Sequence, residues 1–109
     1  PFQPDIAVDI TPVIAKKLAG LDAHQSQFYE WLPWIGNYES EVPKDPAKYK
    51  DWLLQKRVLK PNPEVQKSLV KWYGETRAAK VLYAEAFEIC EYGTQPTEAD
   101  IRTLFPMLN

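Results

Sequence analysis

The chain has 109 residues, of which 45% are hydrophobic and 26% charged, the composition of one folded domain and not of a disordered segment. Its 13 Lys and Arg against 15 Asp and Glu give a net charge of −2, which argues against nucleic acid held mainly by a basic face. No run of 18 apolar residues is present to span a membrane.

The numbers of cysteine and histidine residues limit the metal sites and disulfides that the chain can form. A catalytic zinc ion normally takes three protein ligands, mostly His with a carboxylate or Cys. A single His and a single Cys argue against such a centre being built by this chain alone. The lone Cys90 also excludes an internal disulfide, is consistent with a reducing compartment, here taken as the cytoplasm, and is expected to be a small core residue.

The first predicted elements are a strand and a helix. Residues 5–10 are β-branched and bounded by prolines, which predicts a strand. Thr11 and Pro12 are typical of a helix start, because a hydroxyl can cap free amides and proline has no amide to leave unpaired there. The helix is expected to run to about Gln27, with one apolar stripe at Ile14, Leu18, Leu21 and Phe28. A strand that leads into a helix opens an α/β unit.

The middle of the chain is predicted to be an aromatic loop and a basic helix. Residues 31–46 are expected to form the loop, and Asp45-Pro46 to start a short helix whose inward residues are Tyr49, Trp52 and Leu53. Segment 44–60 carries six basic and two acidic side chains. A solvated helix face is the favoured interpretation, and a patch for an anionic group such as phosphate stays open.

The last third predicts a helix, a strand and a short helix. Asn62-Pro63 starts a helix that runs to about Lys80, with buried positions at Val65, Leu69, Trp72 or Tyr73, and Thr76. Residues 81–90 read as a strand, with a helix over residues 84–89 as the alternative. Thr97 and Asp100 have the form of a capping box and start a final helix that ends at Phe105-Pro106. Two distant strands with helices between them do not make a self-sufficient sheet, so we expect the chain to be the back part of a larger α/β domain or a chain that pairs with the missing part.

Short motifs recur in a definite order along this chain. Val8-Asp9-Ile10-Thr11 ends the first strand, and Ala23-His24-Gln25-Ser26-Gln27 ends the first helix. Arg77 follows, and then Tyr83-Ala84-Glu85-Ala86-Phe87. In this order, and over most of residues 4–106, the chain resembles the C-terminal half of the LmbE/PIG-L family of zinc-dependent de-N-acetylases. The combination of the motifs is more specific than any one of them.

The resemblance implies a fold and an activity. It implies a Rossmann-like three-layer α/β domain of which residues 1–109 are the C-terminal portion, with few strands and three to four helices. It implies a parent hydrolase that uses zinc and an aspartate base to remove the acetyl group from an N-acetylglucosamine-type sugar or glycoconjugate. The family's zinc ligands and base lie in a His-Pro-Asp-Asp segment and a later His-containing segment, and this chain has neither.

The chain by itself is therefore expected to be inactive. It is expected to form walls of the substrate pocket, to help orient the substrate and to make contacts with partners. The implied partners are the missing N-terminal part of the same domain, which brings the zinc, and a small N-acetylated sugar. Nucleic acid and a membrane span are not expected, and a homo-oligomer stays open.

Five residues are candidates for the substrate pocket: His24, Gln27, Trp34, Arg77 and Glu85. Spacing alone makes His24 a partly buried side chain at the edge of the apolar stripe, and the resemblance places it toward the active-site side. Gln27, three positions on, is expected to share a hydrogen-bond network with it on one helix face.

The other three candidates each have a structural alternative. Trp34, with Trp31 and Tyr38, would form a wall for a sugar ring, although three large aromatics so close together usually pack against a core or another subunit. Glu85 on an apolar strand face needs a partner, for which Arg77 is the natural choice, and a substrate contact is the other interpretation. The non-catalytic alternative for the whole chain is a binding or assembly module that uses residues 31–38 and 44–60.

Overall fold

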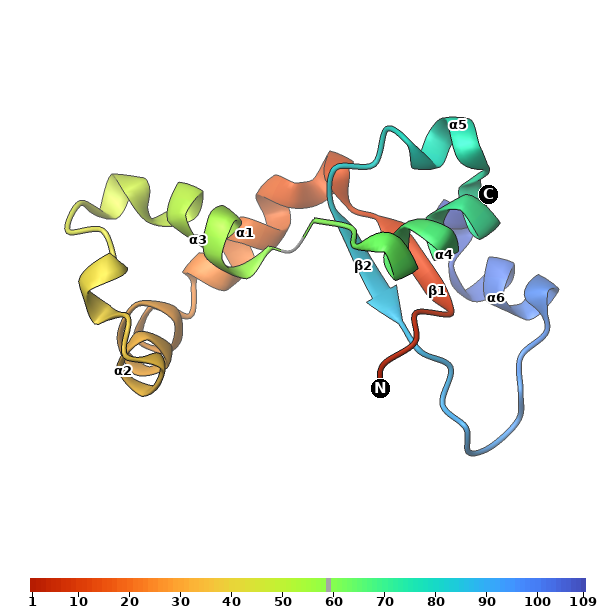
Figure 1. Ribbon diagram of the computed structural model, residues 1–109, viewed down its shortest axis with the longest axis horizontal. Coiled ribbons are helices and arrows are strands. Elements are labelled where there is room, and N and C mark those ends of the chain that lie inside the picture. The colour runs from red at the N-terminus through yellow and green to blue at the C-terminus, as the bar shows by residue number, and fades with distance from the viewer. Residues whose placement is uncertain (59) are drawn as a thin grey trace. The chain divides into compact units, whose positions relative to one another are not determined.

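The computed structural model describes residues 1–58 and 60–109 and divides into two compact units (Figure 1). Unit 1 comprises Pro1–Thr11 and Lys60–Asn109, and unit 2 comprises residues 12–58. Within the described residues there are six α-helices and one sheet of two antiparallel strands, so the fold is mixed α/β. A Rossmann-like sheet is not confirmed. None of the helices described is both long and apolar enough to cross a bilayer.

The sheet of unit 1 joins the two strands expected from the sequence. Strand β1 (Ile6–Asp9) pairs with β2 (Ala84–Phe87), with Ile6 opposite Phe87 and Val8 opposite Glu85. The helical alternative for residues 84–89 is therefore wrong. Strand β2 is shorter than predicted, and Cys90 beyond its end is exposed, not a core residue.

Thr11 does not cap the first helix, contrary to its predicted role. Helix α1 (Ile14–Asp22) begins after a 3₁₀ turn at Thr11–Val13, and its N-terminus has no side-chain cap. The Thr11 hydroxyl instead accepts hydrogen bonds from the amides of Leu82 and Tyr83, at 3.1 and 3.2 Å. Thr11 therefore fastens the end of β1 to the segment that leads into β2.

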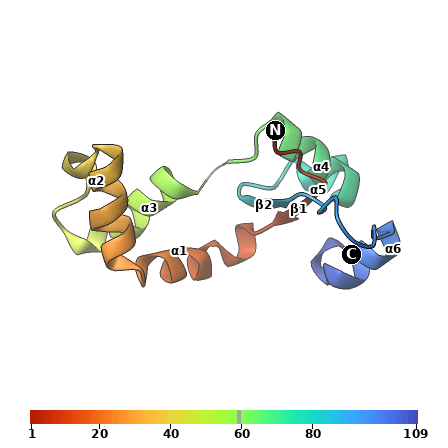
Figure 2. The ribbon, with the colours of Figure 1, turned by 90° about the horizontal axis from the view of Figure 1, so that it is seen from below.

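Helix α4 (Pro63–Tyr73) packs against β1 and builds the core of unit 1 (Figures 1 and 2). It starts as predicted, since the Asn62 side chain accepts from the amide of Val65. Its apolar face places Leu69 in a cluster with Ala7, Ala78 and Val81.

The predicted continuation of this helix to Lys80 is wrong. Gly74 has φ 78°, which ends α4, and the separate helix α5 (Glu75–Ala78) follows. The break turns Thr76 to the surface, so the prediction that it is buried is also wrong.

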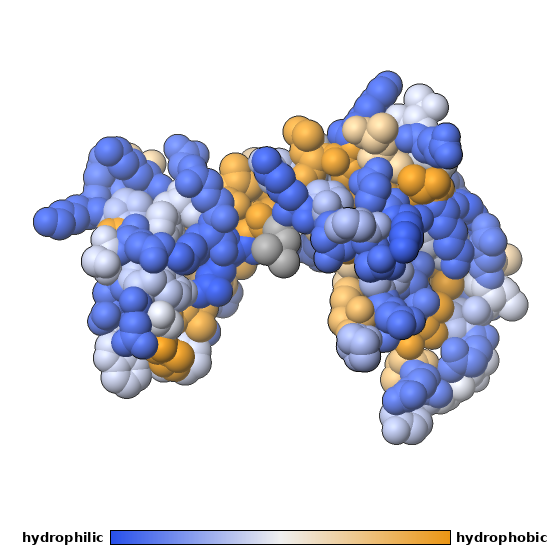
Figure 3. All heavy atoms as spheres, in the orientation of Figure 1, coloured by the Kyte–Doolittle hydropathy of each residue, from blue (hydrophilic) through white to orange (hydrophobic). Residues whose placement is uncertain are grey.

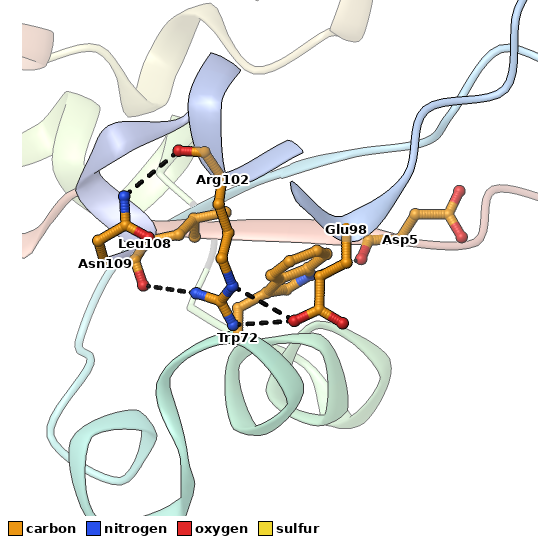
Figure 4. Close-up of polar contacts among 6 residues, drawn as sticks. All are labelled: Asp5, Trp72, Glu98, Arg102, Leu108 and Asn109. Atoms are coloured by element: carbon orange, nitrogen blue, oxygen red, sulfur yellow. Dashed lines mark hydrogen bonds and ion pairs between the residues drawn. The ribbon is translucent and has the colours of Figure 1, made fainter. Parts of the chain in front are cut away.

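Arg102 links three parts of unit 1 (Figure 4). It lies on helix α6 (Glu98–Leu104), its guanidinium donates to the Glu98 carboxylate and the Leu108 carbonyl, and it stands over the ring of Trp72, 5.2 Å from the centroid. The Trp72 indole donates to the carbonyl of Asp5 at 2.8 Å. This chain of contacts ties α6 and the C-terminus to α4 and to the start of β1.

The predicted capping box of α6 is confirmed. The Thr97 hydroxyl accepts from the Asp100 amide, and the Asp100 carboxylate accepts from the Thr97 amide at 2.8 Å and from the Thr97 hydroxyl at 2.7 Å. These bonds favour the charged carboxylate and lower the pKa of Asp100, the side-chain bond contributing most.

We expect Thr97→Val to raise the pKa of Asp100 part of the way back, because the hydroxyl bond is lost while the backbone bond remains. A carboxylate whose pKa is lower in the folded state stabilises the fold above its unfolded pKa of about 3.9, and the contribution is lost as the pH falls through the folded pKa. The variant should therefore lose less stability than the parent between pH 7 and pH 2. An NMR titration of the Asp100 carboxyl carbon checks the pKa, and an unchanged value would contradict this role for the hydroxyl.

Unit 2 contains more helix than the sequence suggests. The first helix ends at Asp22, and after His24 the chain forms a π-helical turn, Gln27–Trp31, that passes into α2 (Leu32–Gly36). The expected loop therefore begins only after α2. Helix α3 (Tyr49–Arg57) follows a 3₁₀ turn capped by Asp45, as predicted. Residue 59 of the predicted basic segment 44–60 lies outside the described residues.

Aromatic rings pack against one another around the core of unit 2. Tyr29 stacks on Tyr49 with ring centroids 3.9 Å apart, and Trp52 lies tilted against both Tyr29 and Tyr38. Leu53 is fully buried, and Tyr49 and Trp52 are half-buried, so the predicted inward face of this helix is confirmed. Rings from two segments thus hold the π-helical turn against α3.

Candidate functional site

An open groove of about 750 Å³ lies on unit 2, along the π-helical turn and α2. The residues that line it are Ser26, Gln27, Tyr29, Glu30, Trp31, Trp34 and Glu39. Two of the five predicted pocket residues, Gln27 and Trp34, are among them. A π-helical turn is a rare conformation that occurs frequently at functional sites.

Two tryptophans with large exposed surfaces dominate the groove. Trp31 is 50% exposed and Trp34 63% exposed. They are three positions apart in helical backbone, which makes them neighbours on one face. Pro33 between them is almost fully buried and anchors the turn to the core. The two indoles therefore face solvent from a backbone that is held in place.

Tyr29 forms a rigid part of the groove. Its ring is buried and stacked on Tyr49, and its hydroxyl donates to the Asp22 carboxylate at 2.6 Å. Burial, and then the bond to the negative carboxylate, raise the pKa of Tyr29 well above its ordinary value. The phenol therefore stays protonated and fixed by Asp22 at any physiological pH.

The groove is acidic. Of its seven described lining residues, Glu30 and Glu39 are charged and none is basic. Two of the three basic side chains of α3 make contacts with other residues: Lys56 pairs with Glu41 and lies over the Tyr38 ring, and Arg57 donates to the Tyr38 hydroxyl. Tyr38 thus belongs to the packing around α3, and the predicted aromatic wall consists of Trp31 and Trp34.

His24 lies beside the groove but is not among its lining residues. It is exposed in the break between α1 and the π-helical turn, and its ring meets the Phe28 ring edge-on, with centroids 6.5 Å apart. The prediction that His24 and Gln27 share the face of one continuous helix is wrong, because the helix ends at Asp22.

Arg77 and Glu85 belong to unit 1. The Arg77 guanidinium lies 4.3 Å from the centroid of the Tyr73 ring and donates to the carbonyls of Met107 and Asn109. Glu85 is half-buried in β2. The sequence analysis did not identify Glu30 and Glu39 as groove residues. If residues 27–36 had been predicted to be helical, the i, i+3 spacing of Trp31 and Trp34 would have indicated the exposed face on which the groove lies.

The described residues do not fit a zinc centre. No three His, Cys, Asp or Glu side chains within residues 1–58 and 60–109 are grouped so that they could hold a metal ion. The groups that the groove presents to a ligand are two exposed indoles, an amide and two carboxylates.

Exposed apolar residues occur on both units, and Figure 3 shows hydrophobic atoms among hydrophilic ones on the face it draws. Only in the groove do two tryptophans and two carboxylates line the same described cavity. Comparison of the chain with models of protein families, with curated proteins and with solved structures found no match.

Proposed function

We propose that this chain is the C-terminal part of a metal-dependent N-deacetylase domain, similar to the LmbE/PIG-L enzymes, that acts on an N-acetylglucosamine-type sugar or glycoconjugate. The observation that carries the proposal is the pairing of two motifs of the resemblance. Val8 lies opposite Glu85, and the Thr11 hydroxyl accepts from Leu82 and Tyr83, 71 and 72 positions away. The motifs thus form one structural element, which gives a physical reason for their occurrence together.

The sheet supports the idea of a larger domain. Among the described residues it has only β1 and β2, so each strand has one edge without a strand partner. Such an edge offers unpaired amides and carbonyls to a further strand. In the proposal, an upstream part of the same domain extends this sheet into a Rossmann-like core and brings the metal ligands and the catalytic base.

The groove supports the choice of a sugar. Exposed indoles offer flat apolar faces to the C–H face of a pyranose ring. Gln27 and the two glutamates supply amide and carboxylate oxygens for its hydroxyl groups. In this proposal the groove binds and orients part of the glycoconjugate, and the metal, bound by other residues, polarises the amide that is cleaved.

The test uses the whole protein as its gene encodes it. It should contain one zinc ion per chain by elemental analysis and release acetate from N-acetylglucosamine oligomers. The isolated 109-residue chain should do neither, and adding an upstream segment that contains His-Pro-Asp-Asp should restore both. Tight zinc binding by the isolated chain, or a whole protein without acetate release, would refute the proposal.

A second candidate is a non-catalytic binding module. The observation that favours it is that every residue lining the groove comes from one unit. A module predicts that the isolated chain unfolds in one sharp thermal transition and binds its ligand without any other segment. A molten or aggregating isolated chain would support the deacetylase part instead.

A further inference from the structure

The groove glutamates differ from several others in their surroundings. Glu41, Glu64 and Glu98 each pair with a basic side chain, Lys56, Lys67 and Arg102 in turn. Within the part of the chain that the structure describes, neither Glu30 nor Glu39 has an ion pair or a hydrogen bond from its side chain. Their negative charge is therefore available to a ligand in the groove.

The two tryptophans also attract a positively charged ligand, as the carboxylates do. The face of an indole ring is negative and attracts a cation that lies over it. Glu30 lies four positions and Trp31 three positions before Trp34, so both are helical neighbours of Trp34, and all three side chains line the groove. A cation placed over these rings would meet the carboxylates as well, whereas an anionic ligand would be repelled.

We propose that the groove prefers a saccharide that carries a free, protonated amine, a glucosamine-type unit, over the same saccharide in its N-acetylated form. The choice of a saccharide rests on the proposed function, and the choice of an amine rests on the charge of the groove. An acetamide has no charge, so it gains nothing from Glu30 and Glu39 beyond ordinary hydrogen bonds. The groove would thus hold deacetylated units of a partly deacetylated glycan.

Calorimetric titration of the whole encoded protein tests the preference. The probes are the β-1,4-linked trisaccharides of glucosamine and of N-acetylglucosamine, at a pH where the amine is protonated and with a chelator present to prevent turnover. We expect the amine form to bind about tenfold more tightly at low salt, which is the size expected for one exposed cation–π contact and exposed ion pairs together. Raising the ionic strength should reduce the difference.

Three variants assign the effect to the groove. The double variant Glu30→Gln with Glu39→Gln keeps the size of both side chains and should reduce the preference for the amine form to the part that the cation–π contact supplies, about threefold. Trp34→Ala should weaken both, since each loses a stacking surface. Glu75→Gln removes the same charge from an exposed position on α5 in unit 1 and should leave the preference unchanged.

Equal binding of the two trisaccharides by the parent protein, binding of neither, or a preference that the double glutamine variant leaves undiminished would overturn the inference. The outcome is separate from that of the proposed function, because the titration requires no turnover. Acetate release without an amine preference would leave the deacetylase proposal standing alone. An amine preference in a protein that releases no acetate would support an amino-sugar site in the groove and refute the deacetylase proposal.

Discussion

Replacing Leu69 by alanine is expected to lower the free energy of unfolding by about 2–5 kcal/mol. Leu69 is fully buried and packs with Ala7, Ala78 and Val81, which come from β1, the end of α5 and the segment after it. Since three separate segments meet at this side chain, the cavity left by its truncation cannot be closed by the movement of one of them. Denaturant unfolding followed by tryptophan fluorescence measures the loss.

Leu104→Ala is the matched control for this substitution. Leu104 is 70% exposed near the end of α6, so removing the same atoms leaves no cavity, and the change should stay within about 0.5 kcal/mol. A similar loss in both variants would mean that Leu69 is not the centre of the unit 1 core.

Gly74→Ala is expected to lower the free energy of unfolding by about 1–3 kcal/mol. Gly74 has φ 78° and ψ 160°, a backbone conformation that residues other than glycine rarely adopt. No atom outside its immediate neighbours lies within 4 Å of the place where a Cβ would be added. The cost would therefore come from the backbone alone and not from a clash. Thermal unfolding of the two proteins measures it.

Gly20→Ala tests the same substitution where the backbone is helical. Gly20 lies within α1 and also has nothing within 4 Å of an added Cβ. Alanine favours the helix and should raise the stability by up to about 1 kcal/mol. Opposite signs at the two glycines are expected, and a loss at Gly20 would indicate a contact that the structure does not contain.

Local signals in the sequence located several element boundaries correctly. Asn62 caps α4, Asp45 caps the turn before α3, and Thr97 with Asp100 caps α6. Each of these contacts joins groups within three positions of one another, so the pattern of residue types carries the whole interaction. The β-branched run of β1 was equally readable, because a buried strand requires such residues.

The candidate site was only half predictable. Trp34 and Gln27 were named from the sequence, but residues 31–36 were expected to be loop. The structure places Pro33 in the first turn of α2, directly after the π-helical turn, with its ring buried in the core of unit 2. With the helical turn in place, Trp31 and Trp34 share a face, and Glu30 and Glu39 join them at the groove.

The sequence by itself determined where most helices and both strands occur, because capping and apolar periodicity act over a few residues. Only the tertiary structure decided which hydroxyl caps a helix and which fastens a strand, and which aromatic ring is packed and which is exposed. Thr11 has the residue type of a cap but accepts from amides more than 70 positions away, and Tyr38 is held by Lys56 and Arg57 while Trp34 is left in solvent. Such outcomes depend on partners that are distant in the chain, and no local pattern specifies a distant partner.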